Sequence, residues 1–163
     1  MFAKSSYEGT REQQYTLLIQ QVEALIHEEP NRIANLANAA ALLGQFLNDV
    51  NWVGFYLLDQ TQDKNELVLG PFQGLPACVR IPLGRGVCGT SAARRETVLV
   101  PDVHAFPGHI ACDAASQSEI VVPILLGDEL IGVLDIDSPI INRFDTIDQH
   151  YLEQFVQKLA AAM

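Results

Sequence analysis

Three cysteines are the side chains in this sequence most able to do chemistry. Cys78, Cys88 and Cys112 lie 10 and 24 positions apart, which matches neither a secreted disulfide framework nor a CxxC zinc site. Cys112 stands in the polar run HIACDAAS, where His109 can assist a thiolate and Asp113 opposes it. Cys78 follows a proline turn, and Cys88 follows a glycine turn where a helix N-terminus would favour the thiolate. In a reducing compartment such thiols are buried structural groups, catalytic groups or redox partners.

A cluster of three carboxyl side chains is predicted at the end of one hairpin. Residues 118–137 alternate in hydrophobicity on both sides of the turn 127–129, and a three-residue loop is a common hairpin length. That register places Glu119, Asp135 and Asp137 together on one face, whereas a two-residue loop would separate Glu119 from the aspartates. Three like charges do not favour stability. The cluster is therefore either a site for a cationic or hydrogen-bond-donating ligand, with one carboxyl kept protonated, or a solvated strand end.

Two aromatic side chains share a face of an earlier predicted strand. Trp52 and Tyr56 alternate with Gly54, which leaves space between the two rings. Such a slot suits a small apolar or sulfur-bearing group, or a cation over a ring. The other interpretation is that both rings are simply packed.

A metal or phosphate site is weakly supported. One loop carries all the common zinc-ligand types, but their spacing matches no compact metal motif and a loop does not preset tetrahedral geometry. These residues are Asp102, His104, His109, Cys112 and Asp113. The glycine turn LGRGVCG lacks the phosphate-loop pattern GxxxxGK[ST]. We therefore predict no bound metal and no bound cofactor.

Composition limits the class of protein. With 163 residues and 48% hydrophobic content, the chain predicts one globular domain over 1–163, with its core at about 12–162. The formal charge of −10 argues against nucleic acid or an anionic membrane as partner. The longest strongly apolar stretch, 120–126, is far shorter than the ~20 residues of a membrane span. The N-terminal residues lack a signal-peptide layout, so we expect a cytoplasmic protein.

Helical periodicity is confined to the two ends of the chain. Apolar residues recur at helical spacing over 18–26, before Pro30, and again over 33–47, where Asn31 is a candidate N-cap. Near the C-terminus Asp145 can cap a helix whose apolar residues follow at every fourth position.

Between these helices the pattern is mostly extended. Strands are predicted over 51–59, 66–72, 79–82, 97–100, 118–126 and 130–137. A short helix follows the glycine turn near 84–86, and 101–117 is a long loop with room for a helical turn. Strands in one run between terminal helices predict an α+β fold, with one antiparallel sheet and helices packed on it.

Five longer runs resemble one enzyme family closely. They are NWVGFYLL, LVLGPFQG, RIPLGRGVCGTSA, VPDVHAFPGHIACDAASQSEIVVPI and IGVLDIDSP. These runs resemble the free methionine-(R)-sulfoxide reductases, which are small GAF-fold enzymes that reduce the free amino acid and not the residue within a protein. The resemblance extends over about residues 10–160. It implies a single GAF-like domain and thiol-dependent reduction of free L-methionine (R)-sulfoxide.

The resemblance also implies roles for the three thiols. Cys112 corresponds to the attacking cysteine, which becomes a sulfenic acid, and Cys78 to the cysteine that resolves it as a disulfide. That disulfide requires Cα atoms within about 7 Å. Cys88 matches a third family cysteine whose role is less settled, such as an alternative redox partner. Thioredoxin, reduced indirectly by NADPH, is the expected reductant.

The substrate contacts follow in the same way. The family pattern implies that Glu119, Asp135 and Asp137 line the substrate pocket, and that Trp52 and Tyr56 form an aromatic wall around the substrate methyl group. GAF domains often pair through their terminal helices, which predicts a homodimer. The competing function is a GAF-type sensor that binds a small metabolite without chemistry.

Overall fold

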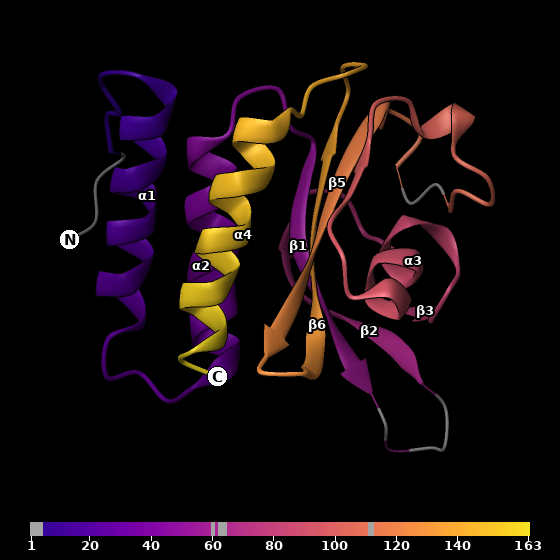
Figure 1. The fold of residues 1–163 in the computed structure, drawn as a ribbon, viewed down its shortest axis with the longest axis horizontal. Helices are drawn as coiled ribbons and strands as arrows, with labels where there is room; N and C mark the ends of the chain where they lie inside the picture. The colour runs from indigo at the N-terminus through magenta and orange to yellow at the C-terminus, as the bar shows by residue number, and fades with distance from the viewer. Residues whose placement is uncertain (1–4, 60, 62–64, 111–112) are drawn as a thin grey trace.

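The computed structural model describes residues 5–59, 61, 65–110 and 113–163. Its centre is a six-stranded sheet in the order β3-β2-β1-β6-β5-β4, with every neighbouring pair antiparallel (Figure 1). The strands are β1 Trp52–Asp59, β2 Glu66–Gln73, β3 Arg80–Pro82, β4 Val98–Val100, β5 Ser118–Leu126 and β6 Glu129–Ser138. The predicted α+β class with one antiparallel sheet is confirmed.

Helices cover both faces of the sheet. The helices are α1 Arg11–Ile26, α2 Arg32–Phe46, α3 Gly86–Arg94 and α4 Thr146–Ala160, with a 3₁₀ turn, η1, at Val103–Ala105. On one face α2 and α4 pack directly on strands, and α1 packs on these two helices from outside (Figure 1). On the other face α3 contacts β3, β4, β5 and β6. The sheet thus separates two hydrophobic clusters, and the smaller cluster lies under α3.

Local sequence accounts for where the helices begin. The predicted caps are present, since the side chain of Asn31 accepts from Ala34 N and Asp145 forms a capping box with Asp148. Most of the predicted apolar stripe of α2 is buried, namely Leu36, Ala40, Leu43 and Leu47. Ile33, in the first turn of the helix, is 68% exposed.

The hairpin of β5 and β6 has the predicted register at its far end. Glu119 lies opposite Asp137, and Val121 lies opposite Asp135. The turn itself is shorter than predicted, because Leu126 pairs with Glu129 across a two-residue loop. A register shift between Ile124 and Leu125 compensates, since β6 carries one extra residue there and so restores the pairing. The bulge therefore keeps the three acids on the face that a three-residue loop predicts.

No helix in the described part of the chain is both long and apolar enough to pass through a membrane.

Candidate active site

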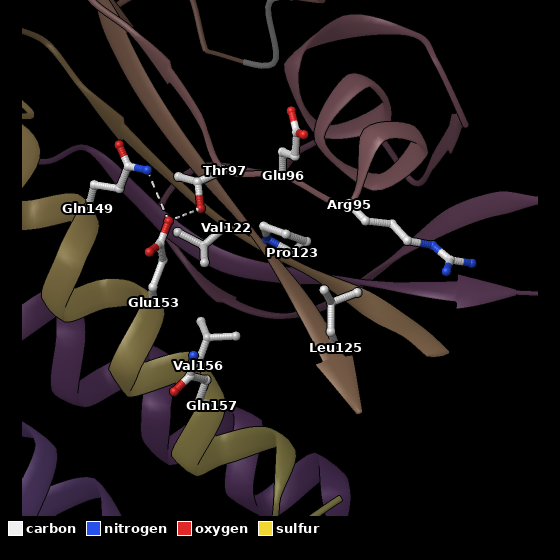
Figure 2. A pocket seen from close by; sticks show the side chains of 10 residues that line it. All are labelled: Arg95, Glu96, Thr97, Val122, Pro123, Leu125, Gln149, Glu153, Val156 and Gln157. Atoms are coloured by element: carbon white, nitrogen blue, oxygen red, sulfur yellow. Dashed lines mark hydrogen bonds between the residues drawn. The ribbon is translucent and has the colours of Figure 1, made fainter. Parts of the chain in front are cut away.

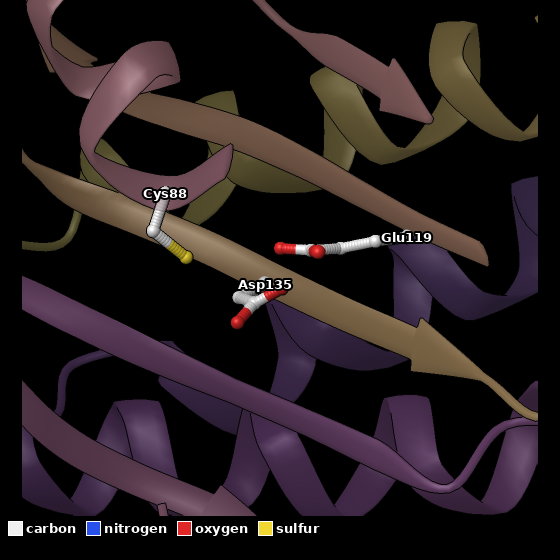
Figure 3. Close-up of side chains that lie close together, drawn as sticks. All are labelled: Cys88, Glu119 and Asp135. Atoms are coloured by element: carbon white, nitrogen blue, oxygen red, sulfur yellow. The ribbon is translucent and has the colours of Figure 1, made fainter. Parts of the chain in front are cut away.

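The predicted acids lie beneath α3, at one end of β5 and β6. Glu119 and Asp135 are 5% and 7% exposed, and Asp137 is partly buried. Gly86, Val87 and Cys88 begin α3 and border the same small pocket as these acids. Figure 3 shows Cys88 reaching from α3 towards Asp135 and Glu119 on the strands below. The solvated-strand-end interpretation of the acids is therefore excluded.

The pocket around the acids is small. Its volume of about 20 Å³ leaves room for about one water molecule. Residues that the sequence did not single out complete its wall: Ile81, Arg85, Gly86, Val87 and Ile110. Ile110 lies directly against the start of α3, because a Cβ built on Gly86 would stand 3.2 Å from its side chain. Four of them belong to the run RIPLGRGVCGTSA, whereas Ile110 comes from a separate loop that no local sequence signal could have placed beside it.

Burial and mutual repulsion determine the electrostatics of the three acids. Burial raises the pKa of Glu119 well above its usual range, and the charge of Asp137 raises it further. Burial likewise raises the pKa of Asp135, with Glu119 adding to the effect, and the pKa of Asp137, with Asp135 adding to it. Burial and repulsion therefore favour the protonated form of these carboxyls, and a protonated carboxyl can donate a hydrogen bond.

Cys88 differs from the sequence-based expectation. The helix N-terminus was expected to favour its thiolate, but the thiol is buried and faces carboxyl groups. Burial raises the pKa of Cys88 well above its usual range, and the charges of Asp135 and Glu119 raise it further. Desolvation and nearby negative charge outweigh the helix dipole. Cys88 is therefore a protonated thiol near neutral pH, and a poor nucleophile.

His109 lies beside the acids. Its Nε2 atom is 3.5 Å from Oε2 of Glu119, and burial lowers the pKa of the imidazole. The sequence singled it out as an aid to Cys112, but Cys112 lies outside the described residues, as does any Cys78–Cys112 geometry. What the structure establishes is that His109 contacts Glu119.

The aromatic pair and the acids occupy one face of the sheet. Trp52 lies opposite Asp137 and Gly54 lies opposite Asp135 in the β1–β6 register, and residues directly opposite in a ladder share a face. The two motifs, far apart in sequence, are thus neighbours in space.

The predicted gap above Gly54 is filled. Trp52 stacks between Tyr56 and Phe72, with ring centroids 5.9 and 5.3 Å apart. A Cβ built on Gly54 would stand 2.5 Å from Cη2 of Trp52, so the indole occupies the space that the missing side chain leaves. The glycine serves aromatic packing rather than an open slot.

Both aromatic residues hold the segment that carries Cys78. The Tyr56 hydroxyl donates to the backbone carbonyl of Cys78 at 2.9 Å, and the Trp52 indole N–H donates to that of Leu75 at 3.0 Å. Cys78 itself is partly buried, while Leu75 and Val79 are 60% and 63% exposed. The thiol of Cys78 thus lies on an anchored segment with exposed apolar neighbours.

Asn51, at the start of the aromatic run, is a site neighbour that sequence reasoning missed. Its Nδ2 donates to Asp113 Oδ2 at 2.8 Å and to Ser116 Oγ at 3.2 Å, and its backbone N–H donates to the carbonyl of Asp137. These bonds attach the segment after residue 112 to the acid end of the sheet. The signal in the sequence was an amide side chain, Asn51, directly before a strand with aromatic residues. No local pattern predicted that Asp113 and Ser116 are its partners.

A larger hollow elsewhere has no comparable chemistry. It measures about 470 Å³ and lies between α4 and the edge of the sheet (Figure 2). Its acid Glu153 is occupied by hydrogen bonds from Thr97, at 2.6 Å, and from Gln149, at 3.0 Å. No cysteine lines it. Cys88 and the three predicted acids line instead the small pocket under α3, whereas Cys78 is not among its lining residues.

The fold and this buried acid pocket define the chain as a GAF domain. The model of the GAF domain family matches residues 31–163. A solved structure of free methionine-R-sulfoxide reductase from Neisseria meningitidis, in complex with its substrate, superposes with a TM-score of 0.92. It is 45% identical and is matched over 99% of this chain and 95% of that one.

Curated relatives carry the same name. The chain is 53% identical to the free methionine-R-sulfoxide reductase of Escherichia coli, over 89% of this chain and 86% of that protein. It is 45% identical to the Saccharomyces cerevisiae protein of that name, over 86% and 80% respectively. The chain belongs to the free methionine-(R)-sulfoxide reductase family, which confirms the resemblance seen in the sequence.

Proposed function

We propose that this protein reduces free L-methionine (R)-sulfoxide to L-methionine. The observation that carries the proposal is the cluster of Glu119, Asp135 and Asp137 around a small pocket, where raised pKa values favour protonated carboxyls. Relatives named for this activity, at 45% and 53% identity, support the same substrate.

The acids suit the first chemical step. A sulfoxide sulfur accepts a nucleophile once its oxygen is protonated or strongly hydrogen-bonded. Glu119, buried and adjacent to a second acid, is the proposed donor, because its raised pKa favours the protonated form. Either aspartate is the alternative donor.

Cysteine chemistry supplies the two electrons. In the proposed step a Cys112 thiolate attacks the sulfoxide sulfur, the oxygen takes up a proton and is transferred to the cysteine sulfur, and methionine leaves. Cys112 becomes a sulfenic acid. The thiol of Cys78 then condenses with it, which forms a disulfide and releases water. Cys88 is the least suited of the three to attack, because its thiol remains protonated.

The acids also explain selection of the free amino acid. A free amino acid carries an ammonium group that a residue within a polypeptide lacks. This cation offsets the mutual repulsion of the buried carboxylates. Ile110 lies against the start of α3 and lines the pocket. Because the pocket holds about one water, the residues around it must rearrange for the substrate to enter.

Thioredoxin is the proposed reductant, with NADPH as the indirect electron source. The support is the surface around Cys78, where Leu75 and Val79 are exposed. An exposed apolar patch beside a disulfide favours docking of a protein dithiol. We also propose that the protein is cytoplasmic, where thioredoxin keeps thiols reduced, and that it is a homodimer.

The test is NADPH consumption with thioredoxin and thioredoxin reductase. Three substrates are compared: free L-methionine (R)-sulfoxide, its (S) epimer and a peptide-bound methionine sulfoxide. We expect turnover of the free (R) form alone. Absence of turnover with all three, after the thiols are shown to be reduced, would contradict the proposal and favour a ligand sensor.

A further inference from the structure

The pocket under α3 brings together three potential metal ligands of mixed type. One ligand atom each from Cys88, Glu119 and Asp135 lies within 4.8 Å of the other two, and all three residues are buried (Figure 3). They come from α3, β5 and β6, so the packing of a helix on two strands creates the group. The proposed reduction uses the acids but gives Cys88 no step.

One of these ligand groups has an unsatisfied atom. Asp135 is 7% exposed, and its Oδ1 is buried with no hydrogen-bond partner among the described residues. A buried carboxylate oxygen without a partner is costly, and such exceptions in native structures call for a bound ion or molecule. Asp135 lines the cavity of about 20 Å³ that Cys88 and Glu119 also border.

We propose that Cys88, Glu119 and Asp135 bind a thiophilic divalent cation, Zn²⁺. A sulfur ligand selects Zn²⁺ over Mg²⁺ and Ca²⁺, which prefer oxygen alone. Zinc takes four ligands at about 2.0–2.3 Å, and this group supplies three of them.

A dication supplies positive charge that Cys88, Glu119 and Asp135 do not themselves carry. Ionising Cys88, Glu119 and Asp135 without a cation would place three negative charges in a buried space. Binding of Zn²⁺ releases the protons of the thiol and of the carboxyl groups to solvent and offsets the repulsion that remains.

A cation at this position would exclude the substrate. Glu119 and Asp135 are also the proposed partners of methionine sulfoxide, so Zn²⁺ and the sulfoxide compete for one pocket. This consequence depends on the proposed function, whereas binding of the cation does not. The first test therefore measures binding without catalysis.

The experiment uses Co²⁺ as a spectroscopic probe for the Zn²⁺ site. The full-length Cys78→Ser/Cys112→Ser variant retains Cys88 as its only thiol, because the chain has three cysteines. Titration with Co²⁺ is expected to give a thiolate-to-cobalt charge-transfer band, and Zn²⁺ should displace it. Adding free methionine sulfoxide is expected to weaken Co²⁺ binding.

Two further variants identify the ligands. Adding Cys88→Ala is expected to abolish the band, and adding Asp135→Asn to weaken Co²⁺ binding by at least about 10-fold. The matched control is Asp128→Asn, an exposed acid in the turn of the same hairpin, which should leave the affinity unchanged. Circular dichroism checks that each variant is folded. A folded double variant with no band, or a band that survives Cys88→Ala, would overturn the proposed site whatever the outcome of the reductase assay.

Discussion

At the residue scale, burial controls the chemistry of this site more than residue type does. Cys88 follows a glycine turn at a helix start, yet the pKa of its thiol is raised because the helix places it against Asp135 and Glu119. Burial also raises the pKa of Glu119. The same pocket therefore disfavours the thiolate of Cys88 and favours a protonated carboxyl.

Glu119→Gln is predicted to lower kcat by about 10²–10⁴-fold, because the amide cannot supply the proton. The raised pKa sets the direction of the pH effect: the donor form is present below the pKa of the folded protein and is lost above it. The wild-type kcat should therefore fall at alkaline pH, and the variant should lose this alkaline limb. Glu129→Gln, an exposed acid on the same hairpin, is the control and should retain the wild-type profile.

Asp135→Asn is predicted to stabilise the protein more at pH 8 than at pH 5. The pKa of Asp135 is raised on folding, so its contribution to stability is greatest below the pKa of the unfolded chain and is lost as pH rises towards the folded value. The loss amounts to as much as about 1.4 kcal/mol per pH unit in that window. Denaturant unfolding at both pH values measures it, and a variant effect independent of pH would contradict the assigned burial.

The two redox cysteines are distinguished by single-turnover kinetics. Cys112→Ser should abolish methionine release, whereas Cys78→Ser should release about one methionine per enzyme and then stall, since no disulfide forms. Quenched-flow measurement of methionine separates the two outcomes. Normal turnover by Cys112→Ser would show that the nucleophile has been assigned incorrectly.

At the element scale, β1 connects the acids of the site to the segment that carries Cys78. It lies between β2 and β6, so its Trp52 and Tyr56 stand beside the acids of β6 and also reach the segment that carries Cys78. We interpret the indole N–H of Trp52 and the hydroxyl of Tyr56 as anchors for the segment that carries Cys78. The rings can still form the wall around the substrate methyl group.

Tyr56→Phe tests the anchoring role. The change removes the hydrogen bond to the Cys78 carbonyl and keeps the ring, so we expect a stability loss of about 1 kcal/mol. Methionine release in the first turnover should be unchanged, while disulfide formation, followed by loss of free thiols, should slow. Tyr151→Phe in α4 is the control. If Tyr56→Phe slowed the first release and the disulfide step equally, the residue would act on the substrate and not through Cys78.

At the scale of the whole molecule, a polar network joins the two ends of the chain. The buried Asp148 in α4 accepts hydrogen bonds from Tyr15 at 2.6 Å and from Arg11 at 2.8 Å, both in α1. Arg143 lies 3.3 Å from its other oxygen. The terminal helices are thereby fixed to each other on the face of the sheet opposite the site.

Asp148→Ala is predicted to cost about 1–3 kcal/mol, because it leaves the buried hydroxyl of Tyr15 without its acceptor. Lys158→Ala is the matched comparison, since Lys158 pairs with Glu23 between the same two helices but both side chains are nearly half exposed. It should cost less than about 1 kcal/mol. Denaturant unfolding measures both, and equal costs would contradict a central role for the buried network.

The sequence by itself determined the elements and much of their pairing. Alternation located the strands to within a residue or two, Asn31 and Asp145 marked two helix starts, and the hairpin pattern placed Glu119 across from Asp137. Helix caps depend on contacts between residues a few positions apart, and strand faces depend on the two-residue alternation of side chains. Both can be recognised in the local sequence.

Only the tertiary structure decided the environment of the site. It showed that α3 and Ile110 line the pocket of the acids, that burial raises the pKa of Cys88, and that Trp52 fills the space above Gly54. The physical reason is that pKa values and cavity shape depend on which distant segments exclude water from a side chain. The exclusion of water from these side chains depends on how a helix and a loop pack against the sheet. No local sequence pattern determines that packing.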